Sequence, residues 1–406
     1  MSRFSQAMSK RVIATASLFL IGSLHTMIFA VFQIPENFLL GRDSIDLAIV
    51  CKIILYTSAI GVSLSHQILC RWVGLKMTLY LGLLCNLFGL ATLMLNQFLG
   101  PDGTLSLVIL DMVFFGVALT SVINSLVTYI ILQYPKKAGL GIVALFAFLN
   151  LGAMLAPLLL DFFHRFKIDS FFYPVLIVLI GLSLFFVRNY FKNPLIPVHL
   201  ERIRRGSLLW KELHYRLALF VIAIIAYGLT ESTFNLWGFT LIQHVLGAST
   251  ANDITSFFWL FMIIGQVILL LPLYFLPASA VFYFLVSVLM GAAFIFPLQT
   301  TVTGFIGALI LAGAGCSAVF PILLSLMEKE MLPFARGGPL LHYIEVGISV
   351  MLAGYFVGVG FIDLWVQKMG VDPMLSLPTH FHLVVIYIGI TCFCTLFLQL
   401  SAPKIK

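Results

Sequence analysis

Few side chains in this 406-residue sequence can do chemistry, and several of them interrupt long apolar stretches. Glu231 is the first candidate, because Ser232 lies beside it and Asn235 follows four residues later. Residues at i and i+4 share one face of a helix, so the carboxyl and the amide would point the same way. Low-dielectric surroundings favour the neutral form of a carboxyl group, which suits a group that takes up and releases a proton. A glutamate that only ties helices together is the structural alternative.

A second candidate pair consists of His342 and Glu345, which are spaced i and i+3 with Ser349 a further turn along. The two could share a proton, because histidine titrates in the physiological range. They follow Arg336 closely, so a salt bridge at the end of the helix explains them equally well. His25 is a lone histidine in its apolar stretch, and it could bind a ligand or be a hydrogen-bonded core residue.

One polar stripe begins at Lys52 and Tyr56 and continues through Ser63 and His66, at spacings that keep all four on one side of a helix. Such a stripe could pair with an anionic ligand or with Asp111. The alternative is that Lys52 extends its ammonium group to a nearby polar surface.

The most polar stripe in the sequence is made by Asp111, Ser121, Asn124, Ser125 and Thr128. Its carboxyl group is a further candidate for proton binding, and its amide and hydroxyl groups are candidates for ligand binding. Serine and threonine also mediate ordinary packing between membrane helices. We expect this stripe to line a cavity, with helix packing as the alternative.

The elements that carry these residues must be membrane-spanning helices. Hydrophobic residues make up 61% of the sequence and charged residues 10%, with a mean hydropathy of +1.09. A spanning helix needs roughly 20 apolar residues, and strand-like alternation is missing, which excludes a membrane barrel. Twelve stretches qualify: 11–32, 45–68, 75–97, 105–132, 138–160, 172–190, 216–243, 253–275, 279–297, 302–326, 336–362 and 380–402.

The basic residues predict the orientation of these helices. With the N-terminus in the cytoplasm, 18 of the 23 Lys and Arg residues fall in inner segments and four in outer loops. This asymmetry satisfies the positive-inside rule and places both termini in the cytoplasm. We expect the protein to lie in the inner (cytoplasmic) membrane of a cell. The asymmetry also explains the net charge of +7 without a nucleic-acid partner, because the excess lies at the surface of the lipid bilayer.

A basic segment, 191–215, divides the chain into an N-terminal six-helix bundle, 1–190, and a C-terminal six-helix bundle, 216–406. Two such halves favour a pseudo-symmetric transporter with a site near the membrane midplane. The six cysteines form no CxxC pair, so no metal site is expected. Motifs for ATP binding and for hydrolase chemistry are missing, so we expect neither an enzyme nor a cofactor.

Local motifs in the first half resemble those of the major facilitator superfamily. The family usually shows Gly-x-x-x-Asp-Arg-x-Gly-Arg-Arg between its second and third helices. Here Gly74 and Lys76 match, but Arg71 stands where the aspartate should be. The stretch from Gly152 to Pro157 is similar to a Gly-x-x-x-Gly-Pro motif associated with exporters. The resemblance implies gating roles for these five residues.

The second half resembles a bacterial branch of the superfamily related to sugar and proton symporters. The resemblance lies in three stretches: YGLTESTFNLW from Tyr227 to Trp237, FWLFMIIG from Phe258 to Gly265, and GAGCSAVFP from Gly313 to Pro321. It implies an all-α fold of twelve transmembrane helices in two bundles. Asn235 and Trp237 of the first stretch are our candidates for substrate binding in this half, and the candidates from the first half are His25, Lys52, Tyr56, Ser121, Asn124, Ser125 and Thr128.

The function expected from these observations is secondary active transport of a small organic solute by alternating access, coupled to protons, with sodium as the other possible ion. Uptake of a sugar, an organic acid or a siderophore-like compound is preferred, and efflux of a drug, metabolite or siderophore is the alternative. A receptor or scaffold that does not transport is the alternative of another class. We expect a monomer.

Overall fold

The structure, a computed structural model, describes residues 3–32, 45–99, 105–134, 137–166, 171–191, 208–331, 340–368 and 373–401. Within these ranges the chain is almost entirely helical and contains no β-strand. The chain divides into two compact units, Met1–Leu132 with Leu145–Leu195, and Gln133–Ala144 with Ile196–Lys406. We call them unit 1 and unit 2 and describe each by itself.

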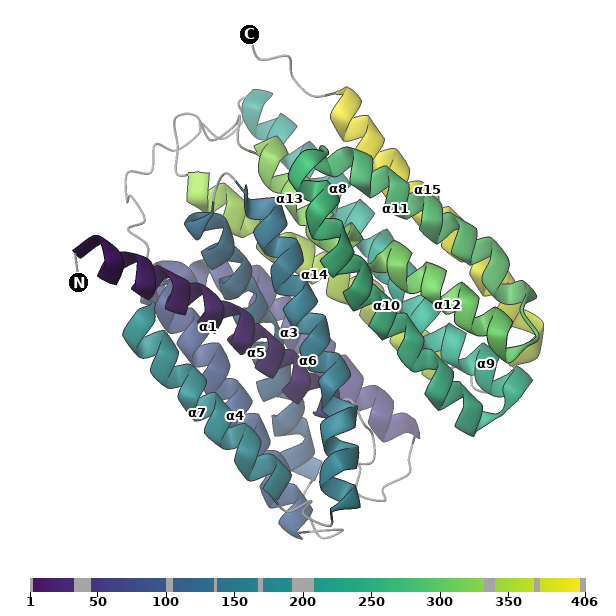
Figure 1. Ribbon diagram of the computed structural model, residues 1–406, viewed down its shortest axis with the longest axis horizontal. Helices are drawn as coiled ribbons and strands as arrows, with labels where there is room; N and C mark the ends of the chain where they lie inside the picture. The colour runs from purple at the N-terminus through teal and green to yellow at the C-terminus, as the bar shows by residue number, and fades with distance from the viewer. Residues whose placement is uncertain are drawn as a thin grey trace. The chain divides into compact units, whose positions relative to one another are not determined.

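Unit 1 is built from long helices that run side by side (Figure 1). They are α1 (Arg3–Phe32), α3 (Ile45–Val73), α4 (Leu75–Leu99), α5 (Leu105–Gln133), α7 (Phe172–Tyr190) and, from Leu145 onwards, α6 (Ala138–Arg165). The central helix is α5, which is buried along most of its length. Within the same unit α4 packs against α7, and α7 packs against α1.

Unit 2 is built from α-helices and from two short helical turns, η4 and η5, and some of its membrane spans are interrupted. They are α8 (Leu208–Ser232), η4 (Thr233–Trp237), α9 (Gly238–Leu246), α10 (Ala248–Phe275), α11 (Ala278–Ile295), η5 (Phe296–Leu298), α12 (Val302–Cys316), α13 (Val319–Met331), α14 (Leu340–Lys368) and α15 (Pro373–Leu400). The helices α14 and α15 both pack along α8. The continuous series α8, η4 and α9 makes one long span, Glu212–Leu246.

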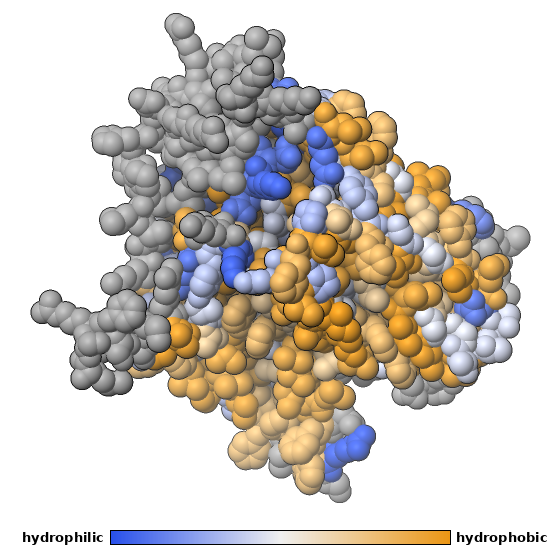
Figure 2. All heavy atoms as spheres, turned by 45° about the horizontal axis from the view of Figure 1, so that its top comes forward, coloured by the Kyte–Doolittle hydropathy of each residue, from blue (hydrophilic) through white to orange (hydrophobic). Residues whose placement is uncertain are grey.

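The expected all-α polytopic membrane fold is confirmed. Eleven helices in the described residues are long and apolar enough to cross a membrane, and α1 holds a shorter apolar stretch, Val12–Ile28. Hydrophobic side chains also cover most of the face drawn in Figure 2. The separation of the eighth and ninth expected spans is correct, because α10 ends at Phe275 and α11 begins after Pro277.

Some expected boundaries differ from the structure. In the second half of the chain α8 begins at Leu208, whereas the sequence analysis expects the first span of this half at 216. The bundle limits, 1–190 and 216–406, and the linker 191–215 stay predictions, because residues 192–207 lie outside the described ranges. The side of the membrane on which the termini lie also stays a prediction.

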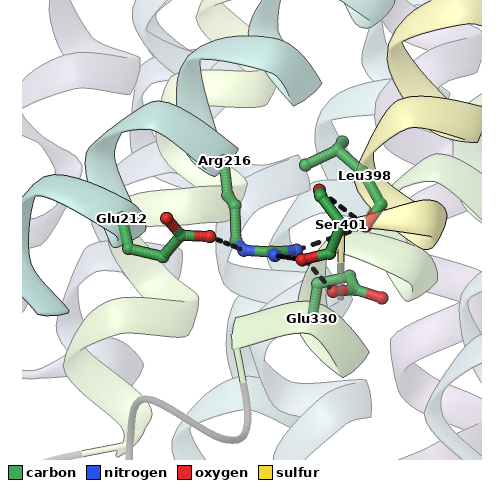
Figure 3. A network of polar contacts seen from close by, with 5 residues as sticks. All are labelled: Glu212, Arg216, Glu330, Leu398 and Ser401. Carbon is green, nitrogen blue, oxygen red and sulfur yellow. Dashed lines mark hydrogen bonds and ion pairs between the residues drawn. The ribbon is translucent and has the colours of Figure 1, made fainter. Parts of the chain in front are cut away.

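A buried arginine joins three helices at one end of unit 2. Arg216 of α8 is only 1% exposed, and its Nε donates to Glu212 Oε1 at 2.8 Å while its Nη1 donates to Glu330 Oε2 of α13 at 3.0 Å (Figure 3). Further N–H groups donate to the backbone carbonyls of Leu398, at 3.3 Å, and Ser401. These carbonyls belong to the last turn of α15 and to the residue directly after it, and the last carbonyls of a helix lack donors from within the helix. The guanidinium therefore neutralises acids and caps a helix at once.

The arginine network predicts a large loss of stability in Arg216→Ala. The substitution leaves the carboxylate of Glu330 without its partner and the end of α15 without its cap, so we expect a loss of about 3 kcal/mol. Thermal unfolding of the full-length protein in lipid nanodiscs would measure it. The control is Arg71→Ala, which removes an exposed cation and should change stability by less than about 0.5 kcal/mol. Equal effects of the two substitutions would contradict the assignment.

Candidate functional site

Glu231 lies at the end of α8, near the middle of the 35-residue span Glu212–Leu246. Its side chain is 6% exposed, and the hydroxyl of Tyr355 on α14 donates a hydrogen bond to its Oε1 at 2.8 Å. No ion pair of this carboxyl group occurs among the described residues. A carboxyl group at this depth is expensive unless it is neutral or partnered, which makes it a candidate for function.

Tyr227 lies one turn before Glu231 and interacts with it. Its hydroxyl donates to the backbone carbonyl of Cys316, the last residue of α12, at 2.8 Å. Its ring stacks on that of Tyr355, with ring centroids 6.3 Å apart. One polar cluster, made of Glu231, Tyr227, Tyr355 and the Cys316 carbonyl, therefore connects α8, α12 and α14. We call it the Glu231 cluster.

The span that includes α12 and α13 is interrupted directly beside this cluster. Pro321 has no backbone N–H, so the carbonyl of Ser317, four residues earlier, cannot receive the usual helical hydrogen bond. The amide Nε2 of Gln266 on α10 donates to this carbonyl instead, at 2.6 Å. Both carbonyls at the interruption, those of Cys316 and Ser317, thus obtain their donors from other helices. Because these donors replace the missing backbone N–H groups, the helix can break inside the membrane without leaving a carbonyl unpaired.

A second irregularity follows Glu231 immediately. Residues Thr233–Trp237 form a π-helical turn, a rare geometry that often occurs at functional sites. Asn235 lies within it and is half-buried, while Trp237 is buried. The sequence analysis places Asn235 one α-helical turn beyond Glu231. The wider π turn changes its direction relative to that expectation, and no hydrogen bond joins the two side chains among the described residues.

Close approach of two helices brings Tyr355 to Glu231. A Cβ on Gly228 of α8 would meet the carbonyl of Tyr355 at 2.8 Å, and one on Gly358 of α14 would meet the carbonyl of Ile225. Each glycine thus lies against the backbone of the other helix. Only the missing side chains at Gly228 and Gly358 allow α8 and α14 to lie this close.

In unit 1 the two predicted polar stripes bind α3 to α5. Asn124 Nδ2 donates to Ser63 Oγ at 3.2 Å, and His66 Nε2 lies 3.2 Å from Ser125 Oγ. All four of these side chains are buried. The structure therefore brings the stripes together in contacts between helices, which is the packing role that the sequence analysis leaves open.

The other predicted polar residues of this unit lie at separate places. His25 of α1 accepts a hydrogen bond at Nδ1 from Asn86 Nδ2 of α4 at 2.8 Å. Asp111 is fully buried and accepts one from the hydroxyl of Thr92. No ion pair of Asp111 occurs among the described residues, so a pairing of the Lys52 stripe with Asp111 stays a prediction.

Three more predicted binding residues, Tyr56, Ser121 and Thr128, are buried in unit 1. Glu345 is buried on α14, ten residues before Tyr355, which corresponds to about 15 Å along a helix. It therefore lies outside the Glu231 cluster. His342 belongs to the same helix, but its side chain lies outside the described part of the structure.

The predicted gating residues have local structural roles. Gly74 adopts φ 86° in the turn between α3 and α4, a conformation that favours glycine. Lys76 Nζ donates to the carbonyl of Arg188, in the last turn of α7, at 2.6 Å, and Arg71 is exposed. A Cβ on Gly152 would meet the carbonyl of Ser23 on α1. The side chain of Pro157 is not described.

Sequence reasoning missed the residues that complete these sites. Tyr227 could have been found, because its i−4 spacing from Glu231 puts both on one helix face. The i, i+4 spacing of Glu212 and Arg216 is a similar signal. Tyr355 and Gln266 come from other helices, and no spacing in the sequence connects them to their partners.

The approach of α8 to α14 predicts that Gly358→Ala is destabilising. The added methyl group would overlap the carbonyl of Ile225, and we expect a cost of about 1–3 kcal/mol. The matched control is Gly307→Ala in α12, where a Cβ meets nothing within 4 Å. There we expect no loss, and a gain of up to about 1 kcal/mol from helix propensity. Thermal unfolding would compare the two variants, and an undiminished stability of Gly358→Ala would refute the close contact.

The hydrogen bond from Gln266 to the carbonyl of Ser317 predicts an energetic coupling between Gln266 and Pro321. Gln266→Leu leaves that carbonyl without a donor, at a cost of about 1–3 kcal/mol. Pro321→Ala supplies a backbone N–H four residues after Ser317, so Gln266→Leu should cost less in the Pro321→Ala background. A double-mutant cycle measured by thermal unfolding would give the coupling. Strictly additive effects would mean that the amide does not replace the missing N–H.

Solved membrane transporters share this architecture over nearly the whole chain. The E. coli fucose:proton symporter is 14% identical with a TM-score of 0.75, and the match covers 96% of this chain and 99% of that one. The proton:xylose symporter XylE is 14% identical with a TM-score of 0.72, covering 99% and 97%. The human organic anion transporter MFSD10 is 12% identical with a TM-score of 0.71, covering 96% and 99%.

No family model and no curated protein matches the sequence itself. At 12–15% identity the structural likeness establishes the fold rather than the activity. A second structure of the fucose symporter, described as a major facilitator superfamily transporter in the outward conformation, agrees with a TM-score of 0.76. The chain therefore has the fold of the major facilitator superfamily transporters.

Proposed function

We propose that this protein is a secondary active transporter that moves a small organic solute across a membrane by alternating access. The observation that carries the proposal is the Glu231 cluster, a buried carboxyl group at mid-span beside a π turn and a helix interruption. Irregular backbone at membrane depth is tolerated where it lines a cavity or is buried in protein, and transporters place their sites at such points. The shared fold supports the proposal.

Protonation of Glu231 is the proposed coupling step. An ionised carboxylate attracts the hydroxyl hydrogens of both Tyr227 and Tyr355, whereas a neutral carboxyl group attracts them less. The Tyr227 hydroxyl has one hydrogen, which it gives to the Cys316 carbonyl in this structure. A change of charge at Glu231 therefore changes the competition for that hydrogen, and with it the support of the interruption between α12 and α13. Proton binding would in this way shift the balance between two arrangements of the same helices.

The proposed substrate is a sugar, an organic acid or a siderophore-like compound, taken up together with protons. Two of the structurally similar proteins are named as sugar:proton symporters and one as an organic anion transporter. Asn235 and Trp237, in the π turn, are the proposed substrate contacts of unit 2. Residence in the inner membrane, with both termini in the cytoplasm, belongs to the same proposal.

The test uses the purified protein in vesicles that contain a pH-sensitive dye. A panel of sugars, organic acids, chelators and drugs is added under an imposed pH gradient. We expect one class to change the internal pH and to accumulate. Glu231→Gln keeps the size of the side chain but cannot exchange a proton, so it should abolish accumulation while solute exchange continues.

The matched control is Glu328→Gln, a buried glutamate of α13 outside the Glu231 cluster, in which uphill transport should persist. Full uphill transport by Glu231→Gln would remove Glu231 from the coupling step. Movement of the solute in the direction opposite to that of the protons would indicate efflux. No flux of any solute from folded protein would favour the receptor or scaffold alternative.

A further inference from the structure

Residues of α4 that are spaced seven apart face α5. A Cβ on Gly82 would touch Ser121 and Val122 at 2.9–3.0 Å, and one on Gly89 would touch the ring of Phe115 at 2.9 Å. Residues seven apart lie almost directly above one another on a helix, so Asn96 continues the same face. The contacts step backwards along α5 as they step forwards along α4. Asn96 therefore faces the early turns of α5.

Asp111 lies at the same level of this interface. It is one turn before Phe115 on α5, and its Oδ1 accepts a hydrogen bond from the hydroxyl of Thr92, one turn before Asn96 on α4. Asp111 and Thr92, with Asn96 one turn beyond Thr92, thus form a group of polar side chains between α4 and α5.

Polar atoms of this group lack partners although they are buried. Asp111 is 0% exposed and Asn96 is 1% exposed. Asp111 Oδ2, Asn96 Oδ1 and Asn96 Nδ2 have no hydrogen-bond partner among the described residues, and Asp111 makes no ion pair there. Native proteins rarely leave such atoms unpaired, and an isolated ionised carboxylate in apolar surroundings costs far more than a neutral amide. The group is therefore built for an additional charged or polar partner.

We propose that Asp111, Asn96 and Thr92 bind one alkali cation of about the size of Na⁺. They offer carboxylate, amide and hydroxyl oxygens, which are the ligands that hard cations prefer. One carboxylate balances one positive charge, whereas a divalent ion would leave an uncompensated charge at a buried position. A proton alone would neutralise Asp111 but would supply no partner to Asn96 Oδ1 and Nδ2, which have none among the described residues.

This inference does not depend on the proposed transport function, because ion binding can be measured without flux. The experiment follows the melting temperature of the full-length protein in lipid nanodiscs as NaCl replaces choline chloride at constant ionic strength. We expect a saturable rise with Na⁺, a smaller one with K⁺, and binding of one ²²Na⁺ per chain. A ligand that binds only the folded state stabilises it in this concentration-dependent way.

Two variants test the ligands. Asp111→Asn removes the charge with little change of shape, so it should abolish the Na⁺ effect and melt at or above the wild-type temperature in choline. Asn96→Leu should also abolish it, while Asn96→Asp, which keeps an oxygen at this place, should retain Na⁺ binding. Glu231→Gln, in the other unit, should leave the response unchanged.

Two results would overturn the inference. The first is a melting temperature that is the same in Na⁺, K⁺ and choline at every pH tested, which would mean that only a proton occupies the group. The second is a Na⁺ response that survives in folded Asp111→Asn. Failure of solute transport in vesicles would not affect either result, so the two proposals can fail separately.

Discussion

The structure depends on one constraint: a polar group inside the membrane must find its partner within the protein. Water cannot supply donors or acceptors there, and an unpaired carbonyl or charge costs several kcal/mol (about 2–7 for an amide or hydroxyl). Helices satisfy their own backbone groups, except where they end or break. The two clearest solutions in unit 2 are the amide of Gln266, which serves the carbonyl beside Pro321, and the guanidinium of Arg216, which serves the end of α15.

The same constraint identifies the candidate functional sites. At Glu231 the partners are hydroxyl groups, which can donate to a charged or a neutral carboxyl group and leave its protonation free to change. At Asp111 and Asn96 the partners are incomplete. The first arrangement suits a group that changes its charge, and the second suits a group that receives an ion. Between α3 and α5, by contrast, Ser63 and Ser125 take part in hydrogen bonds that join the two helices.

The two kinds of site also differ in how the backbone behaves around them. The Glu231 cluster is surrounded by a π turn and a helix interruption, so small changes in hydrogen bonding can alter the path of the chain. Asp111 and Asn96 lie between two uninterrupted helices, α4 and α5, whose contact is fixed by Gly82 and Gly89. A rigid surround is suited to binding an ion, and an irregular one to conformational change.

The sequence by itself determined the helices and their order. Apolar runs of sufficient length predict membrane spans, and Pro277 marks the break between α10 and α11 where no charge does. It also singled out Glu231 and Asp111, because acids are costly in such runs. It could not show that the span from 302 is interrupted at Ser317, since the apolar run continues through the break.

Only the tertiary structure decided which groups meet. Tyr355 reaches Glu231 from a helix that is distant in sequence, and Thr92 reaches Asp111 from the preceding helix. The physical reason is that an apolar helix in lipid has no strongly preferred face. Its rotation is set by close contacts at residues such as Gly228 and Gly358, and by polar groups seeking partners, and both depend on the neighbouring helix.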